Sequence, residues 1–348
     1  MIKNGYKLNE CDKCIYIKSW NNLHVIISLY VDNMLIFGSN MHVINETKNM
    51  LKSHFDMKDL GEANLFLGMK ITKTCDVIFL DQSHYVEKIL RKYNFHDHKS
   101  VATPFDSSVH LFPVNYDDEI FNQKDYASII GSLRYATDCT RPDIAYAVGV
   151  LSRFTSKPSK DHWLATERVM RYLIGTKNYG LFYKNYPTVI EGFSDADWNT
   201  LSGDSLSTTG YIFTLGSGAI CWKSKKQKII ANSTMEAKLI ALASASEEAN
   251  WLRDLLYEIP LWEKPIPPIL IHCDSTAAIG RVKNHYYNGK SRPIRRKHST
   301  VRSYLSSGII TVDYIKSNEN LADPFTKVLA KDRVWNTSRG MGLKSIES

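Results

Sequence analysis

The sequence predicts a multidomain protein of mixed α+β and α/β structure that ends in a mixed five-stranded sheet with flanking helices. The chain has 348 residues, which is long for one hydrophobic core and favours two or three domains. Its 43% hydrophobic and 23% charged residues are typical of an ordinary globular protein. Residues 187–330 follow the order β-β-β-α-β-α-α-β-α, which fits one sheet with helices packed on its faces.

Short strands and two helices are expected in residues 1–106. The predicted elements are hairpins over 15–40, a helix over 41–55, a strand pair over 64–82 and a helix over 84–95. Asp32 and Asn33 separate two apolar, β-rich runs, and both residue types favour a turn there. This first part therefore reads as hairpins covered by short helices.

Residues 107–186 are expected to form a linker and a helical region. The best linker candidate is 107–125. The three predicted helices cover 126–139, 141–154 and 160–176.

The period of the apolar residues changes at about residue 187. The predicted strands are 189–198, 207–216, 218–227, 269–274 and 309–316. The predicted helices are a long one that includes 239–256, then 275–282, 298–307 and 323–329. Residues 331–348 are expected to be a C-terminal tail.

Four acidic residues lie where these predicted strands and helices end or begin: Asp195, Glu236, Asp274 and Asp323. The strand that ends at Asp274 is the expected neighbour of the strand that ends at Asp195, so both carboxylates should emerge at one sheet edge. Gathered carboxylates repel by about 4 kcal/mol per pair at 4 Å and an effective dielectric near 20. Divalent cations would remove this repulsion, and oxygen ligands select Mg²⁺ or Mn²⁺. Two such ions can cut a phosphodiester bond.

Each of the four acids also has a purely structural interpretation. Asp195 can be a turn residue, and Glu236 completes a capping box that begins three residues earlier. Asp274 can cap the helix that follows it, and Asp323 precedes a proline in the way an N-cap residue does. The sequence pattern alone leaves both interpretations open.

A basic stretch over 281–305 holds only Lys and Arg among its charged residues apart from histidine. A solvated helix face is the ordinary reason for such a stretch, but one sign of charge beside an acidic metal site also suits phosphate contacts. A smaller basic group lies in 222–228. The candidate nucleic-acid-binding residues are Lys223, Lys225, Lys226, Lys290, Arg292, Arg295, Arg296 and Lys297.

Charge and composition exclude several classes of protein. Lys and Arg outnumber Asp and Glu by 44 to 36, and this excess suits a polyanionic partner. The sequence has no apolar run of 18 residues and no signal-peptide pattern, so we expect neither a membrane nor a secreted protein. The 6 cysteines are scattered, as reduced thiols are. An intracellular location, cytoplasmic or nuclear, is expected.

These motifs resemble the Pol polyprotein of copia-type LTR retrotransposons over nearly the full length of the chain. SDADW, WKSKKQ, NSTMEA, HCDSTAAI, RRKHS and LADPFTK resemble the ribonuclease H domain of that family in its usual order. YVDNMLIFG, KDLGEANLFLGMKI and TRPDIAYAVGVLSRF resemble palm, thumb and connection parts of its reverse transcriptase. The implied domains are a truncated reverse transcriptase palm and thumb over 1–106, a linker and helical connection region over 107–186, and a ribonuclease H-like domain over 187–330.

The resemblance implies that the last domain is an endonuclease that hydrolyses the RNA strand of RNA–DNA hybrids with two Mg²⁺ or Mn²⁺ ions. The implied metal-binding and catalytic carboxylates are Asp195, Glu236, Asp274 and Asp323. It also implies a role for His298 in proton transfer or product release. A second Glu often stands two residues after Glu236 in this family, but the chain has Lys238 there, so Glu236 is the acid carried over. The implied partners are an RNA–DNA hybrid or other nucleic acid, and other Pol or Gag products.

The chain departs from the family in its polymerase motif. The family reads Tyr-Val-Asp-Asp-Met where this chain has Asp32 followed by Asn33, and Asn is an uncharged ligand. The fingers and the first half of the palm are also missing from the 31 residues before Asp32. We therefore expect a 5′-truncated fragment without DNA polymerase activity, and primer extension by the purified protein would contradict this. The alternative to an active nuclease is a decayed or repurposed fragment that binds nucleic acid without cutting it.

Overall fold

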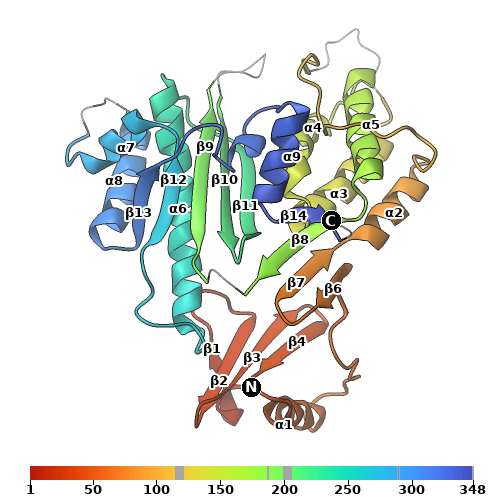
Figure 1. Ribbon diagram of the computed structural model, residues 1–348, viewed down its shortest axis with the longest axis vertical. Helices are drawn as coiled ribbons and strands as arrows, with labels where there is room; N and C mark the ends of the chain where they lie inside the picture. Colours follow the sequence, from red (N-terminus) through yellow and green to blue (C-terminus); the bar gives the residue numbers. More distant parts are fainter. Residues whose placement is uncertain (114–120, 186–187, 199–205, 288, 290, 347–348) are drawn as a thin grey trace. The chain divides into compact units, whose positions relative to one another are not determined.

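The computed structural model describes residues 1–113, 121–185, 188–198, 206–287, 289 and 291–346, and it divides into two compact units (Figure 1). The small unit comprises Met1–Ala63 and Glu248–Pro268. The large unit comprises Asn64–Glu247 and Ile269–Ser348. The domain boundaries expected at 106, 186 and 330 stay a prediction. Strands far apart in the sequence pair with one another inside the large unit.

The small unit is a four-stranded antiparallel sheet with a helix packed on it. Its strands are β1 (Lys7–Leu8), β2 (Ile15–Trp20), β3 (Leu23–Tyr30) and β4 (Asn33–Gly38), and its helix is α1 (Met41–Lys52). A 3₁₀ turn, η1, covers Ile2–Asn4. Val25 and Ile27 of β3 pack against Val43 and Leu51 of α1 in a buried core. The hairpins predicted over 15–40 and the helix predicted over 41–55 are confirmed.

The first sheet of the large unit has the order β14-β8-β7-β6-β5 and is antiparallel. Its strands are β5 (Leu65–Phe66), β6 (Met69–Lys73), β7 (Val77–Asp81), β8 (Tyr179–Lys184) and β14 (Leu343–Ser345). The segment expected to be a C-terminal tail, 331–348, contains α9 (Lys331–Gly340), which leads into β14. Met341 and Leu343 are fully buried, which ties this end of the chain to the core.

Four further helices share one buried core. They are α2 (Ser83–Lys92), α3 (Gln123–Cys139), α4 (Ala145–Leu151) and α5 (Lys160–Gly175). The 3₁₀ turns η2 (Pro142–Ile144) and η3 (Ser152–Phe154) flank α4. Asn122 and Ser159 cap α3 and α5 with their side chains, as helix-starting residues of these types do. The predicted helical middle region is confirmed.

The second sheet of the large unit is the predicted mixed sheet, with the order β11-β10-β9-β12-β13 (Figure 1). Its strands are β9 (Glu191–Asp197), β10 (Thr208–Leu215), β11 (Gly218–Lys226), β12 (Ile269–Cys273) and β13 (Ile310–Tyr314). The first three are antiparallel, and β12 lies parallel to both β9 and β13. The accompanying helices are α6 (Thr234–Glu258), α7 (Thr276–Lys283) and α8 (Arg292–Ser306). The expected fold class, a mixed five-stranded sheet with flanking helices, is confirmed.

Two local predictions for this sheet are wrong. The helix expected over 323–329 is only the 3₁₀ turn η4 (Asp323–Phe325), which ends where the Thr326 hydroxyl donates to the side chain of Asp195. Asp195 itself lies inside β9 rather than at its end.

In the described part of the chain, no helix combines the length and apolar character needed to cross a membrane.

Candidate acidic site

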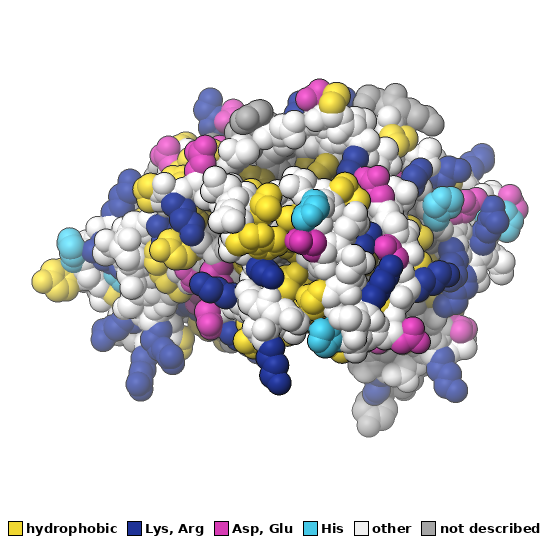
Figure 2. Space-filling view, turned by 90° about the horizontal axis from the view of Figure 1, so that it is seen from below, with side chains coloured by type: hydrophobic (Ala, Val, Ile, Leu, Met, Phe, Trp, Pro, Cys, Tyr) yellow, Lys and Arg dark blue, Asp and Glu magenta, His cyan; other side chains and the backbone are white. Residues whose placement is uncertain are grey.

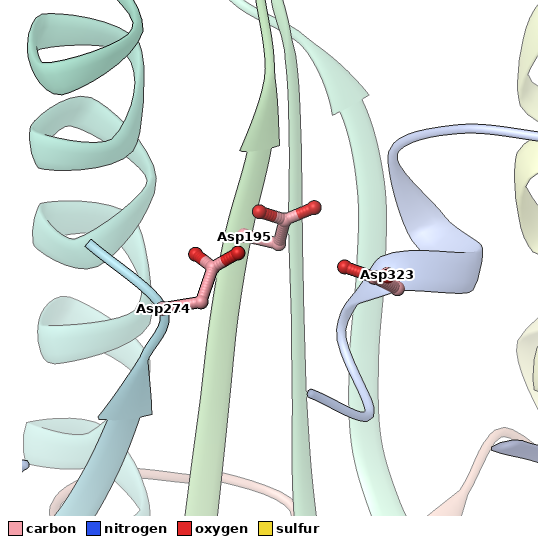
Figure 3. A group of neighbouring side chains, drawn as sticks. All are labelled: Asp195, Asp274 and Asp323. Carbon is pink, nitrogen blue, oxygen red and sulfur yellow. The ribbon is translucent and has the colours of Figure 1, made fainter. Parts of the chain in front are cut away.

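Three aspartates from separate parts of the sequence meet at the second sheet (Figure 3). Asp195 is on β9, Asp274 follows β12, and Asp323 begins η4. One carboxylate oxygen from each lies within 4.8 Å of the others. Because β9 and β12 are parallel and Cys273 pairs with Ser194, the next residue of each strand reaches the same place. The predicted juxtaposition of Asp195 and Asp274 is therefore confirmed.

A lysine ammonium lies between two of these carboxylates. Lys238 Nζ donates to Asp195 Oδ1 at 2.9 Å and to Asp274 Oδ1. The remaining oxygens are also bonded, because Thr326 Oγ1 donates to Asp195 Oδ2 at 2.5 Å and Ser317 Oγ to Asp274 Oδ2 at 2.6 Å. The side chains of Asp195 and Asp274 are only 1% and 2% exposed. Both carboxylates are thus buried with every oxygen already paired.

Asp323 is paired with two further cations. Arg333 Nη2 donates to Asp323 Oδ2 at 2.7 Å, and Lys327 Nζ lies 3.0 Å from Asp323 Oδ1. The Lys327 contact is an ion pair without hydrogen-bond geometry, since Asp323 Oδ1 has no hydrogen-bond partner. Lys327 Nζ is also 3.8 Å from Asp195 Oδ2. Three cations therefore face the three carboxylates of the cluster.

The electrostatics of the cluster follow from burial and these pairs. Burial acts to raise the pKa of Asp195, but Lys238, Lys327 and the hydrogen bonds to its oxygens outweigh burial and hold the pKa below its ordinary value. Burial acts to lower the pKa of Lys238, but Asp195 and Asp274 raise it well above the ordinary value. Burial and the charge of Asp195 raise the pKa of Asp323 to about 6. At neutral pH Lys238 is therefore a firmly held cation.

Asp197 supplies a prediction about pH. Burial and the nearby charge of Asp195 raise the pKa of Asp197 to about 6. Between pH about 4 and 6 the folded chain holds a proton that the unfolded chain has lost, so this carboxyl makes the protein less stable as pH rises. Asp197→Asn should therefore raise the free energy of unfolding at pH 7 by about 1–3 kcal/mol, with no gain below pH about 4.

Urea unfolding of wild type and Asp197→Asn at pH 4, 5, 6 and 7 measures this effect. The exposed Asp313→Asn is the control and should follow the wild-type pH profile. An Asp197→Asn protein whose stability runs parallel to wild type across this range would contradict the prediction.

Glu236 is not brought into the cluster. Its carboxylate accepts from Asn232 N at 2.9 Å, and its N–H donates to the Ser233 hydroxyl at 3.2 Å, which is a capping arrangement. Successive helix residues turn by about 100°, so residues two apart point to nearly opposite sides. Lys238 therefore faces the aspartates on α6, and Glu236 does not. The structural interpretation of Glu236 is the one that the structure shows.

His298 is buried where α8 packs against α7. It is 2% exposed on α8, and its Nε2 lies 2.9 Å from the carbonyl oxygen of Arg281 on α7. Its ring is 5.6 Å from the ring of Tyr287. The side chain thus packs α8 against α7, and its contacts among the described residues are with Arg281 and Tyr287.

The basic candidates on α8 differ in their exposure and in whether they form an ion pair. Arg292, Arg295 and Arg296 are exposed and line a shallow hollow. Lys297 is engaged, since its Nζ donates to Glu247 Oε1 at 2.8 Å. Lys290 lies outside the described residues. The α8 face therefore presents a group of three arginines.

The second basic group is at the other edge of the sheet. Lys223 and Lys225 are exposed on β11, with Lys226 half-buried beside them. Since β11 and β13 are the two edge strands and α8 packs against β13, the predicted basic residues form two separate groups. On the face shown in Figure 2, Lys and Arg side chains are scattered among acidic and apolar ones rather than gathered.

The polymerase-like motif forms a tight hairpin in the small unit. Val31 and Asp32 are the two loop residues between Tyr30 and Asn33, which pair across β3 and β4. Val31 has a φ of 51°, a strained value for a β-branched residue. Asp32 and Asn33 are both exposed at this turn.

The fit of the cluster to divalent cations depends on the spacing of its oxygens and on its donor set. The spacing of the oxygens by itself is consistent with a metal site. The set of side chains around these oxygens does not suit a metal ion, because Lys238 already bridges the two carboxylates that would share it. A divalent ion about 4 Å from an ammonium is repelled by about 8 kcal/mol at an effective dielectric near 20. The side chains present therefore do not fit a pair of bound metal ions.

Sequence reasoning missed the cations at this site. Lys327 stands four residues after Asp323, a spacing that could have suggested the pair. Arg333 belongs to the segment that was expected to be a tail. Lys238 departs from the family pattern, but its partners depend on how α6 is rotated against the sheet.

Comparison with known proteins gives both a family match and relatives. Residues 1–107 match the family described as reverse transcriptase (RNA-dependent DNA polymerase). The chain is 39% identical to the retrovirus-related Pol polyprotein from transposon TNT 1-94 of Nicotiana tabacum, over 99% of the chain and 26% of that protein. It is 32% identical to the corresponding polyprotein from transposon RE2 of Arabidopsis thaliana, over 99% of the chain and 23% of that protein. The chain thus spans about a quarter of the length of these relatives.

A solved structure also resembles part of the chain. It is that of LC11-RNase H1, isolated from compost by a metagenomic approach. The sequence identity is 16%, the TM-score is 0.32, and the match covers 40% of this chain and 94% of that one.

Proposed function

Because this chain belongs to the family of copia/Ty1-type retrotransposon Pol polyproteins, we propose that its ribonuclease H-like domain binds the backbone of RNA–DNA hybrids. The exposed arginine group of α8 carries this proposal. Arg292, Arg295 and Arg296 are three and four residues apart, so their guanidinium groups lie along one helix face. Arginine binds phosphate oxygens in a bidentate manner and remains charged at every physiological pH.

Removing this arginine group should weaken binding and its dependence on salt. The variant Arg292→Gln, Arg295→Gln, Arg296→Gln should bind a labelled hybrid on the order of 10- to 100-fold more weakly at low salt. Each lost phosphate contact lowers the slope of log affinity against log salt by about 0.9, so the slope should fall by about 2–3. Fluorescence anisotropy across a salt series, with EDTA present, measures both quantities.

The matched control removes the same charge from exposed arginines elsewhere. It combines Arg91→Gln, Arg134→Gln and Arg339→Gln. This control should bind nearly as wild type does, apart from a small effect of net charge. Equal losses in the two triple variants would show that binding follows total charge rather than the α8 face.

Hydrolysis of the RNA strand by two metal ions is the second candidate function. The three aspartate oxygens within 4.8 Å of one another favour it. The lysine between Asp195 and Asp274 stands against it. A hybrid labelled on its RNA strand, incubated with the full chain and Mg²⁺ or Mn²⁺, separates the two candidates.

We expect binding without cleavage in that assay. Asp274→Asn serves as the control for contaminating nuclease, since it removes a carboxylate of the cluster. Cleavage by wild type that disappears in Asp274→Asn would establish hydrolysis in place of binding alone.

A further inference from the structure

We infer that the ammonium group of Lys238 takes the place of a divalent cation at the acidic site, so that this chain does not bind Mg²⁺ or Mn²⁺ there. We also infer that the block resides in this one side chain, so that a carboxylate at position 238 would create a metal site. The inference rests on the fold and on the contacts of Lys238. It is independent of whether the arginines of α8 bind a hybrid.

The first observation behind the inference is the position of the Lys238 ammonium between two carboxylates. Lys238 Nζ donates to one oxygen of Asp195 and to one oxygen of Asp274. Asp195 is on β9, and Asp274 directly follows β12, the parallel neighbour of β9. Carboxylate oxygens placed together in this way are the kind of ligand that Mg²⁺ takes. The lysine side chain is 12% exposed, so its charge is held among the carboxylates rather than in bulk solvent.

The second observation behind the inference is that two further cations, Lys327 and Arg333, lie at the cluster. Lys327 and Arg333 pair with Asp323, and Lys327 also approaches Asp195. With Lys238, these cations match the carboxylates of the cluster in number. Lys238 is the cation that donates to both Asp195 and Asp274, so a metal ion that enters between these two carboxylates would have to displace this buried lysine.

The substitution that reverses this state follows directly. Lys238→Glu changes the local charge by two and adds two oxygens at the end of a side chain that points to Asp195 and Asp274. Three carboxylates would then lie around the volume that the ammonium fills, and Asp323 would be the fourth acid of the cluster. Hard oxygen ligands of this number suit Mg²⁺ or Mn²⁺.

Isothermal titration calorimetry with MnCl₂ on the metal-free full chain tests the inference. Wild type should show no Mn²⁺ site at this position. Lys238→Glu should bind Mn²⁺ there, at least tenfold more tightly than any Mn²⁺ binding that wild type shows. The exposed Lys177→Glu makes the same change of charge away from the cluster and should titrate as wild type does. Thermal unfolding of the same samples should show Mn²⁺ raising the melting temperature of Lys238→Glu only.

The four carboxylates of Lys238→Glu could prevent folding in metal-free buffer. In that case Mn²⁺ should restore structure in a circular dichroism titration, with no such effect on wild type. A Lys238→Glu protein that neither binds Mn²⁺ when folded nor gains structure with it when unfolded overturns the inference. Wild type that binds Mn²⁺ as tightly as Lys238→Glu also overturns it. These titrations contain no nucleic acid, so they stand apart from the hybrid-binding test in EDTA.

Discussion

Replacing Lys238 with methionine should lower the free energy of unfolding by about 3–5 kcal/mol in metal-free buffer, because breaking a buried ion pair leaves a charge uncompensated. The side chains of Asp195 and Asp274 are 1% and 2% exposed, so water cannot take over the role of the ammonium. Methionine is close to lysine in length and fills similar space, so the loss reports charge rather than a cavity. Urea unfolding at pH 7 with EDTA measures it.

Two comparisons isolate the cause of this loss. Lys297→Met breaks the exposed pair with Glu247, whose side chain is 48% exposed, and should cost less than about 1 kcal/mol. Adding Asp274→Asn to Lys238→Met should recover part of the loss, since one unpaired carboxylate is removed. A Lys238→Met protein as stable as Lys297→Met would show that the aspartates do not depend on this lysine.

Replacing Arg141 with methionine should also cost about 3–5 kcal/mol. Arg141 is fully buried, and its Nε and Nη2 donate to the two oxygens of Asp143 at 3.0 and 2.7 Å. Its Nη1 also donates to the carbonyl oxygen of Thr176 at 3.1 Å. Among the described residues, the substitution leaves the buried Asp143 with the hydroxyl of Tyr172, which donates to Oδ2 at 2.8 Å.

Urea unfolding at pH 7 measures the effect of Arg141→Met. Arg134→Met is the matched control, because Arg134 pairs with Asp138 on the surface of α3 and its loss should cost less than about 1 kcal/mol. A double variant that also carries Asp143→Asn should be more stable than Arg141→Met alone. Equal stability of Arg141→Met and Arg134→Met would show that this buried pair contributes nothing.

The strand order of the acidic site was predictable because it follows from local patterns. The apolar run before Asp274 and the run that contains Asp195 both read as strands, and the helix between them requires a crossover. Two strands joined in this way are expected to be parallel and adjacent, and the observed register of β9 with β12 agrees. Proximity of these two acids needed no knowledge of side-chain packing.

Local sequence patterns do not predict which residue of α6 faces the aspartates. Glu236 and Lys238 both lie near the start of a helix whose position the sequence predicts. Which of them faces the sheet depends on the rotation of the helix about its axis, and that rotation is set by the packing of its buried residues. The position of Glu236 at a predicted helix start and the family pattern both point to Glu236 as the acid of the site, whereas the fold directs Lys238 at the aspartates.

Local sequence patterns also do not predict the strand and ion pairs made by the last part of the chain. Residues 343–345 are too few to show a strand period, and they become β14 only because β8 offers them an open edge. Arg333 reaches Asp323 through this placement of α9. No spacing within the sequence encodes that contact.

By itself, the sequence determined the family, the order of strands and helices, and the meeting of Asp195 with Asp274. These properties depend on residue types and on periods of two or 3.6 residues, which are local. The tertiary structure alone decided that Lys238, Lys327 and Arg333 neutralise the cluster and that Glu236 caps a helix. Charges on separate segments act on one another only after packing has fixed their distances, so the state of the site is a property of the folded chain.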